Sequence, residues 1–428
     1  MNKHLTILGI CCITGISLFA QTGTKQKSSQ IIVTNTVSVA LKDKPVTIKR
    51  NKLLGIPKAA SYPIIIFQKD TIPSQLDDLN GDHKWDELFF VTDLQANEKK
   101  VFTIKWVSTK PNYVKKTSIR FSKRTAANAP VEPATEEIVY AKELPKSLGF
   151  QRYQTDGPSW ENDKVGFRHY LDGRNAKDVF GKLVPYMSPE NVGINAKGEV
   201  EDNYHVMEKW GRDILAVGNS VGLGGIALWK GNKPERLGVT VDDAVNNVEK
   251  TTFHIVSEGP VRSIMNLTYK NWKAAGKDYN VDETTSIWPG MYAYQNSVKI
   301  SGLEGNEDLA IGLVSINAKN QPTVIKVNDK WVALISHERH TYNKEWWLGL
   351  ALIVPAESYI GFSQAPKKGS LSNSFLARLK IKNNEPVNYY AVAGWELSDK
   401  GFSNAAYFKK YVLNLVKQIS VPIKVAVK

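Results

Sequence analysis

The sequence predicts an all-β protein, organised as one large β-sandwich with a single C-terminal helix. Most of the chain consists of short runs rich in valine, isoleucine, threonine and aromatic residues, separated by residues that favour turns. Helical periodicity is confined to one segment near the C-terminus. A chain of 428 residues could hold two average domains, yet large sandwiches reach this length as single units.

The first element, residues 1–20, predicts a secretory signal peptide. Lys3 and His4 form a short basic start, an apolar run follows, and Ala20 supplies the small residue at the cleavage site. The only cysteines, Cys11 and Cys12, lie inside this segment, so the mature chain can form no disulfide. The bulky Ile10 before Cys11 argues against a lipid anchor. We expect export to the periplasm.

Residues 21–428 are predicted to form one catalytic domain with three parts: a leading β-layer at about 30–108, a connection at 108–148 and a main body at 149–428. The connection is rich in lysine, proline and alanine and has few large apolar residues, which is typical of a loop. The predicted strands are Ile31–Leu41, Pro63–Gln68, Leu88–Leu94, Val101–Val107, Gly224–Trp229, Val261–Tyr269, Trp331–Ile335, Leu348–Val354 and Tyr389–Trp395.

The predicted helix covers residues 404–419. Its apolar residues recur at three- and four-residue spacing, which indicates one face packed on the sheets. They are Phe408, Tyr411, Val412, Leu415, Val416 and Ile419. After the signal peptide no apolar run approaches the ~20 residues of a membrane helix, so we expect no membrane span.

The charge of the chain favours an acidic partner. Its formal net charge of +14 falls to +13 when Lys3 leaves with the signal peptide, and long-range attraction favours anionic ligands. Dispersed lysines also serve solubility alone, so charge does not decide the point. Nucleic acid is disfavoured, since the chain shows no RGG tract, zinc spacing or basic helix and is predicted to be exported. The sequence makes no prediction of oligomeric state.

Two polar segments, 156–174 and 202–213, stand out among the predicted strands. Both combine tryptophan, histidine, tyrosine, arginine and carboxylates, a mixture that favours a sugar-binding acid-base site over a core. Side chains alternate along a strand, so Arg168 and Tyr170 share one face and His169 takes the other, where it is a core histidine or lies behind the site. The same alternation separates Tyr204 from His205 if that segment is extended.

The motifs of the mature chain, over about residues 30–425, resemble the bacterial family labelled domain of unknown function 4861. The resemblance implies a β-sandwich related to galactose-mutarotase-like folds, in exported proteins tied to polysaccharide breakdown. Some members resemble oligosaccharide dehydratases, which remove water from a non-reducing-end uronic acid and leave a 4,5-unsaturated sugar. The residues that carry it are 72–77 with the acidic loop after them, 157–163, 168–172, 178–182, 204–205, 210–213 and 288–292.

This chemistry needs a cation for the uronate carboxylate, a base for the C5 proton and an acid for the departing hydroxyl. Histidine works near neutral pH with little tuning, and arginine binds a carboxylate through two hydrogen bonds. We therefore expect His205 as the preferred proton carrier. The other expected catalytic residues are Tyr170, Arg168, Arg212 and His169. The expected substrate-binding residues are Trp160, Arg174, Tyr204, Lys209, Trp210, Trp288 and Tyr292.

Each assignment has a structural alternative. Tryptophan in a large sandwich is more often core than a sugar platform, and Arg174 can simply pair with Asp172 across a turn. The activity also has rivals. A polysaccharide lyase uses the same elimination with a sugar as leaving group, an aldose epimerase would show a histidine facing a glutamate, and a carbohydrate-binding protein would have lost the chemistry.

An acidic loop precedes the predicted strand Leu88–Leu94. It places oxygen ligands at alternate positions, as a loop that wraps Ca²⁺ does, through Asp78, Asn80, Asp82 and Asp86. It departs from an EF-hand, since His83 replaces the glycine and Phe89 the bidentate glutamate. The alternative is a hairpin turn at Asn80-Gly81. We expect no cofactor in catalysis and a structural calcium ion in this loop.

Overall fold

The computed structural model describes residues 29–57, 61–144, 151–240, 243 and 245–428. The predicted signal peptide, 1–20, lies outside these residues. The described chain is built from antiparallel β-sheets with one α-helix, α2 (Ala405–Ser420), close to its C-terminus, which confirms the predicted fold class. No helix within the described ranges has the length and apolarity to cross a membrane.

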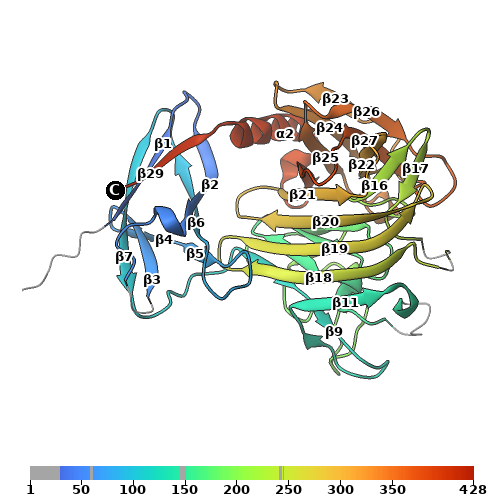
Figure 1. The fold of residues 1–428 in the computed structure, drawn as a ribbon, viewed down its shortest axis with the longest axis horizontal. Coiled ribbons are helices and arrows are strands. Elements are labelled where there is room, and N and C mark those ends of the chain that lie inside the picture. Colours follow the sequence, from blue (N-terminus) through green and yellow to red (C-terminus); the bar gives the residue numbers. More distant parts are fainter. Residues whose placement is uncertain (1–28, 58–60, 145–150, 241–242, 244) are drawn as a thin grey trace, which may run out of the picture.

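The segment predicted as the leading β-layer forms two sheets around a core of its own (Figure 1). Ile31, Val33, Leu88, Phe90 and Phe102 are buried between the sheets. The first sheet has the order β29 (Ile423–Val427), β1 (Gln30–Asn35), β7 (Lys99–Val107), β3 (Tyr62–Phe67) and β4 (Asp70–Ile72). The second has the order β2 (Leu41–Lys49), β6 (Glu87–Leu94) and β5 (Ser74–Asp77). We refer to these strands as the leading sandwich.

The main body is a sandwich of larger sheets, of which the nine-stranded one carries the long hairpins at the centre of Figure 1. Its order is β11 (Glu136–Tyr140), β18 (Val248–Glu258), β19 (Ser263–Ala274), β20 (Lys277–Ile287), β21 (Ala293–Ser301), β28 (Val387–Trp395), β25 (Leu348–Pro355), β24 (Trp331–Glu338) and β23 (Thr323–Lys326). A five-stranded sheet has the order β17 (Lys233–Arg236), β16 (Ile226–Lys230), β22 (Glu307–Val314), β27 (Ser374–Lys380) and β26 (Tyr359–Gln364).

The third sheet of the main body carries both polar segments. Its order is β15 (Gly211–Asp213), β14 (Lys177–Lys182), β13 (Val165–His169), β12 (Ser159–Asn162) and β8 (Thr117–Arg120). The segment 108–148, predicted as a loop-rich connection, supplies β8 to this sheet and β11 to the nine-stranded sheet, and also holds β9 (Ser122–Lys123) and β10 (Glu132–Pro133). Its composition did not reveal these strands, because they are short and place few large apolar residues in the core.

Helix α2 matches the predicted segment 404–419 to within one residue at each end. Its buried face, which includes Phe408, Val412 and Val416, packs against β24 and β25. The approach is close because Gly349 has no side chain: a Cβ there would lie 2.4 Å from the ring of Phe408. At its other end the helix reaches the leading sandwich, where the Lys44 amine donates to the carbonyl of Gln418 over 2.6 Å.

Asn404 caps this helix, and removal of its side chain should lower the stability of the folded protein by a measurable amount. Its side-chain oxygen accepts from the backbone amides of Ala406 and Tyr407, which otherwise lack partners inside the helix. We expect Asn404→Ala to lower the free energy of unfolding by about 1 kcal/mol in urea titrations. Lys409→Ala, on the exposed face of the same helix, is the control, and an equal loss in both variants would contradict a capping role.

Candidate functional site

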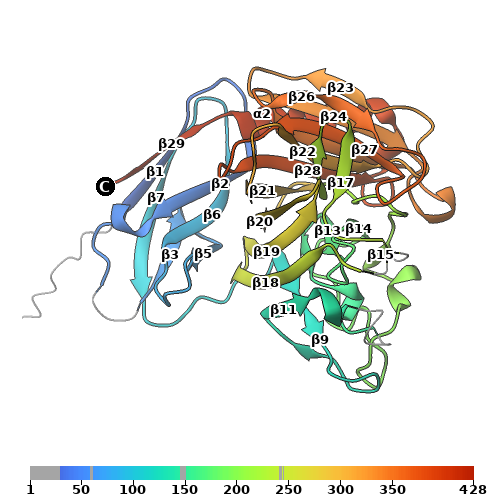
Figure 2. The ribbon, with the colours of Figure 1, turned by 45° about the vertical axis from the view of Figure 1, so that its right-hand side comes forward.

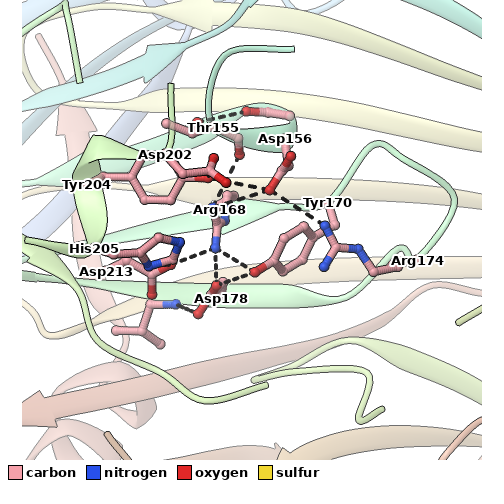
Figure 3. A network of polar contacts seen from close by, with 12 residues as sticks. Thr155, Asp156, Arg168, Tyr170, Arg174, Asp178, Asp202, Tyr204, His205 and Asp213 are labelled. Carbon is pink, nitrogen blue, oxygen red and sulfur yellow. Dashed lines mark hydrogen bonds and ion pairs between the residues drawn. The ribbon is translucent and has the colours of Figure 1, made fainter. Parts of the chain in front are cut away.

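The site begins with Arg168, which strand pairing brings opposite a carboxylate. Arg168 on β13 pairs in register with Asp178 on β14, and Phe180, two residues farther on, pairs with Asp213 on β15. Because side chains two residues apart share a face, Asp178 and Asp213 converge on the guanidinium from neighbouring strands. Figure 3 shows the three side chains meeting.

The guanidinium of Arg168 is buried, with a side chain only 1% exposed, and its contacts with carboxylates run through Nη1 and Nη2. Nη2 forms ion pairs with Asp178 and, at 2.8 Å, with Asp213, and it donates to the Tyr170 hydroxyl at 2.5 Å. Burial lowers its pKa, but Tyr170, Asp178 and Asp213 together raise it above the usual range. Arg168 is therefore not free to bind a substrate carboxylate, which corrects the predicted role.

Tyr170 lies on the same face as Arg168, as the alternation predicted. Its hydroxyl donates to Asp178 at 2.7 Å, and burial raises the pKa of the phenol well above its ordinary value. A phenol held in this way stays protonated near neutral pH. We therefore assign Tyr170 the positioning of Arg168 and Asp178 in place of the predicted proton exchange.

His169 points to the opposite side of the sheet, into the core. Its ring lies 3.3 Å from the Tyr269 hydroxyl and is completely buried, and burial with the charge of Lys177 lowers its pKa to about 3. It shares no surface with the Arg168 network. His169 is a neutral core histidine, and the expectation that it is catalytic was wrong.

His205 is the member of the network that reaches solvent, with a side chain 42% exposed. The segment is not extended: His205 ends a 3-10 turn, η4 (Asn203–His205), which places Nδ1 3.5 Å from the Asp213 carboxylate. Its ring lies 4.7 Å from the ring of Tyr204 and 5.6 Å from that of Tyr342. A 3-10 turn, not a strand, presents the predicted proton carrier.

Local charge keeps His205 neutral. Burial and the charge of Arg168 lower the pKa of its imidazole, and Asp202 and Asp178 oppose that shift. Asp213 lies close, but burial and the charge of Asp178 raise its own pKa and it already pairs with Arg168, so it adds little to the stability of an imidazolium. The result is an unprotonated imidazole at the edge of a buried charge network, which suits a general base.

Asp156 is a second ionisable group at this edge, and the sequence analysis gave it no role. Burial raises its pKa, Asp172 adds to the shift, and Arg168 and Arg174 oppose it. It lies 3.8 Å from Arg168 and 3.5 Å from Arg174, and the Tyr204 hydroxyl approaches it to 3.4 Å. Tyr204 donates more directly to Asp202, at 2.8 Å.

The backbone around Asp156 is strained. Thr155 and Asp156 have φ values of 51° and 60°, which non-glycine residues rarely adopt. Gly157 follows with φ 150°, and a Cβ there would lie 2.2 Å from the His169 carbonyl. Strain of this kind costs about 1–3 kcal/mol per residue and clusters at functional sites. The Thr-Asp-Gly sequence before β12 was the pattern from which Asp156 could have been predicted as a site residue.

A cavity of about 460 Å³ opens beside the network. Tyr170 and Tyr342 line it together with two arginines, Arg174 and Arg236. Arg174 stacks 3.7 Å from the Tyr170 ring centre, pairs with Asp172 and Asp156, and keeps 27% of its side chain exposed. It is one of the predicted substrate-binding residues that the structure places at a cavity.

Arg236 was not foreseen. Its guanidinium donates to the carbonyls of Arg174, Asn219, Ser220 and Ser370 and has no ion pair with a carboxylate among the described residues. Burial and the charge of Arg174 lower its pKa to about 10. A buried cation held by neutral carbonyls attracts an anion to the cavity.

The predicted aromatic platforms do not line this site. Trp160, Trp210 and Trp288 are 1%, 5% and 7% exposed, and Trp160 packs in the main core against Phe167 and Tyr294. Trp210 packs with Phe180 and Tyr204 behind the network. Trp288 and Tyr292 lie near α2, in a different core cluster. Burying the large ring of a tryptophan in the core stabilises the fold more than exposing it for a sugar would. None of the three tryptophans therefore offers a face at this site.

The two remaining predicted cations lie outside the network. Lys209 is exposed. Arg212 faces away from Asp213, as its strand neighbour must, and pairs with Glu345 at 3.3 Å over the ring of Trp346. The carboxylate-binding role predicted for Arg168 or Arg212 therefore fits Arg174 and Arg236 better.

The side chains of the acidic loop accept hydrogen bonds from the loop's own backbone amides. Asp78 accepts from the amides of Gly81 and His83, both at 2.8 Å, and Asp86 accepts from Leu79 at 2.7 Å. Across the described part of the chain, no three histidine, cysteine or acidic side chains form a group that could hold a metal ion. The structure lends no support to the calcium site, which stays a prediction.

Removal of calcium tests that prediction. An ion held by Asp78, Asn80, Asp82 and Asp86 would bind the folded state alone, so EDTA should lower the melting temperature of the wild type. Asp82→Ala should lower it by a similar amount and abolish the response to EDTA. A melting temperature unchanged by either treatment would leave the loop as a hydrogen-bonded turn.

The fold is that of an all-β protein with two sandwiches. In the site, His205 and Asp156, a carboxyl group whose pKa is raised, lie around the buried Arg168 (Figure 3). A basic cavity lies beside them. Comparison with known sequences places the chain in a family. It belongs to the family described as Domain of unknown function (DUF4861), which matches residues 33–425.

Comparison with known proteins finds similar chains. Over 380 residues the chain is 25% identical to "Uncharacterized protein P7" of Formosa agariphila, a match covering 84% of this chain and 82% of that protein. Among solved structures, an alpha-mannosidase from Enterococcus faecalis aligns with a TM-score of 0.47 at 9% identity, over 94% of this chain and 46% of that one. A glycosyl hydrolase family 38 protein from Enterococcus faecalis aligns with a TM-score of 0.47 at 8% identity, over 95% and 48%. The chain thus spans about half the length of these two structures.

Proposed function

We propose that this protein is an oligosaccharide dehydratase, which eliminates water from a non-reducing-end uronic acid during the breakdown of acidic polysaccharides. The observation that carries the proposal is the exposed, neutral His205 beside a cavity that Arg174 and Arg236 line. Elimination next to a carboxylate needs a base and a cation for that carboxylate. Arg174 and Arg236 line the cavity, and His205 is linked to it through Tyr342, which lines the cavity with its ring centre 5.6 Å from that of His205. The product is a 4,5-unsaturated uronate.

In the proposed reaction His205 is the base. Its Nδ1 faces Asp213, so Nε2 is the nitrogen left to take the C5 proton. The electrons of the C–H bond form the C4–C5 double bond, and the C4 hydroxyl leaves as water with a proton from an acid. Asp156 is our candidate for that acid, because burial raises the pKa of its carboxyl group. Tyr204 lies between the two residues.

The two arginines of the cavity are the proposed partners of the substrate carboxylate. Neutralising that group makes the C5 proton more acidic. Removal of this proton is the difficult step of the elimination. Arg168, Tyr170, Asp178 and Asp213 act behind these residues as positioning groups. The network keeps a fixed charge below His205 that requires no rearrangement during the reaction.

The deciding experiment is incubation with saturated oligosaccharides that end in a uronic acid. A new ultraviolet absorbance, with a product lighter by one water and an intact chain, supports a dehydratase. The same absorbance with chain cleavage means a polysaccharide lyase, and a change of stereochemistry alone means an epimerase. Binding without any conversion means a carbohydrate-binding protein. An otherwise identical oligosaccharide with a neutral terminal sugar is the control.

The proposed setting is the periplasm, where the predicted signal peptide would deliver the protein. The net positive charge agrees with an acidic oligosaccharide as its partner. Cell fractionation tests the location.

A further inference from the structure

A second cavity lies where the leading sandwich, the main body and helix α2 meet, and we call it the junction cavity. Its volume is about 340 Å³, within the range of small-molecule sites, which often form between packed units. Figures 1 and 2 show β2 and α2 side by side at this junction, away from β13, β14 and β15. Strand β2, the turn between β20 and β21, and α2 all contribute to its lining.

The lining has an aromatic wall. Phe89, Trp288, Tyr390 and Tyr411 all border the cavity, and the Trp288 and Tyr390 rings meet edge to face with centres 6.3 Å apart. Arg262 also borders it, but its charge is neutralised by ion pairs with Asp77 and Glu87. The wall offers an apolar surface of the kind that covers the C–H face of a sugar ring.

Lys44 also lines the cavity, as a buried amine with unmet donors. The residue is 7% exposed, and its ammonium has three donors, of which one reaches the Gln418 carbonyl at 2.6 Å. No carboxylate in the described part of the chain forms an ion pair with it. Burial accordingly lowers the pKa of Lys44 to about 8. A bound anion would relieve the cost of this isolated charge.

The backbone that presents Lys44 is irregular in a way that points to a site. Between Leu41 and Lys44 the register of β2 against β6 shifts, and Asp43 inside this bulge has φ 44°. Bulges re-aim side chains and are common beside binding sites, and a non-glycine residue at positive φ is strained. Asp43 itself lines the cavity and lies so close to Gly290 that a Cβ there would meet its carboxylate.

Neutral polar groups complete the lining. Ser286, Gln295 and Asn414 border the cavity, and their side chains make no hydrogen bond to other described residues. They offer donors and acceptors to hydroxyl groups. A ligand that matches all three features carries one negative charge, several hydroxyls and an apolar ring face.

We propose that the junction cavity is a second binding site, which takes a monosaccharide-sized sugar acid with its carboxylate on Lys44. The assignment does not depend on the reaction proposed for the other cavity. The site joins both sandwiches and α2, so a ligand there would hold the leading sandwich against the main body.

Calorimetric titration with glucuronate tests the proposal, with glucose as the neutral probe. In Lys44→Met, which keeps the length of the side chain and removes the amine, we expect glucuronate binding at this site to weaken at least about tenfold, as loss of a hydrogen bond to a charged group does. Lys44→Arg should retain most of the binding. Lys105→Met, an exposed lysine of the leading sandwich, is the matched control and should bind as the wild type does.

Two further variants separate this site from the first cavity. Gln295→Leu, which removes one of the neutral groups, should also weaken binding here, and Arg174→Met should affect only the glucuronate that binds at the first cavity. Equal affinity for glucuronate in the wild type and a folded Lys44→Met variant would overturn the proposal. So would equal affinity for glucose and glucuronate, or no binding of glucuronate. Failure of the proposed dehydratase would appear in the product assay and leave this titration unaffected.

Discussion

We expect His205→Ala to lower turnover of a uronate-ended oligosaccharide by ~10²- to 10⁴-fold, the usual contribution of a positioned acid-base group. The fold should survive, because the side chain is 42% exposed and lies at the end of a short turn. Circular dichroism checks the fold, and initial rates followed by the ultraviolet absorbance of the product give the loss. His254→Ala, an exposed histidine on β18, is the control and should keep full activity.

The pH profile of the wild type supplies an independent reading of the same residue. A base whose pKa lies below the ordinary 6.5 is deprotonated at neutral pH and becomes protonated only as the solution turns more acidic. The acid limb of kcat/KM should therefore fall below pH 6.5 and disappear in His205→Ala. Full activity in the variant, or an unchanged acid limb in its residual activity, would refute the assignment.

Arg168→Met should destabilise the protein by about 3–5 kcal/mol, because two buried carboxylates would lose their shared cation. Asp178 and Asp213 are both fully buried, so no solvent takes over this role. Urea titration followed by tryptophan fluorescence measures the loss. Lys326→Met removes the cation of an exposed pair with Asp329 and should change stability by no more than about 1 kcal/mol.

A triple variant distinguishes charge from packing at Arg168. Arg168→Met combined with Asp178→Asn and Asp213→Asn removes all three charges and keeps similar volumes, so it should recover part of the stability lost in the single variant. If the single variant costs less than 1 kcal/mol, the network is not a structural charge cluster. If the triple variant is less stable than the single one, packing and hydrogen bonds dominate over charge.

The sequence predicted elements with a strong local pattern. The helix at 404–419 was recognised because one of its faces is apolar, and strands such as Leu348–Val354 because the whole run is apolar and both faces are buried. Strand β20, Lys277–Ile287, was missed, since its buried positions include threonine and glutamate and its outer positions are polar. Its pairing partners β19 and β21 decide the structure there, and single-sequence periodicity does not contain that information.

At the candidate site, alternation along β13 was enough to place Arg168 with Tyr170 and His169 on the other side. It did not predict that Asp178 and Asp213 neutralise Arg168, because that depends on which strands pair and in which register. The same holds for Arg236, which reaches the cavity from β17, outside both polar segments. The aromatic platforms failed for a different reason: residue type alone does not separate a buried ring from an exposed one.

The pairing of β1 with β29 restricts the order in which the protein can be assembled. Ile31 lies opposite Val427, so the sheet that begins the described chain is closed by a strand made hundreds of residues later. Until β29 arrives, β1 has an open edge, and open edges invite pairing with other chains. A nascent or translocating chain would thus carry an adhesive strand through most of its synthesis. Chaperone capture of that edge would be more useful to this protein than to one whose early strands pair among themselves.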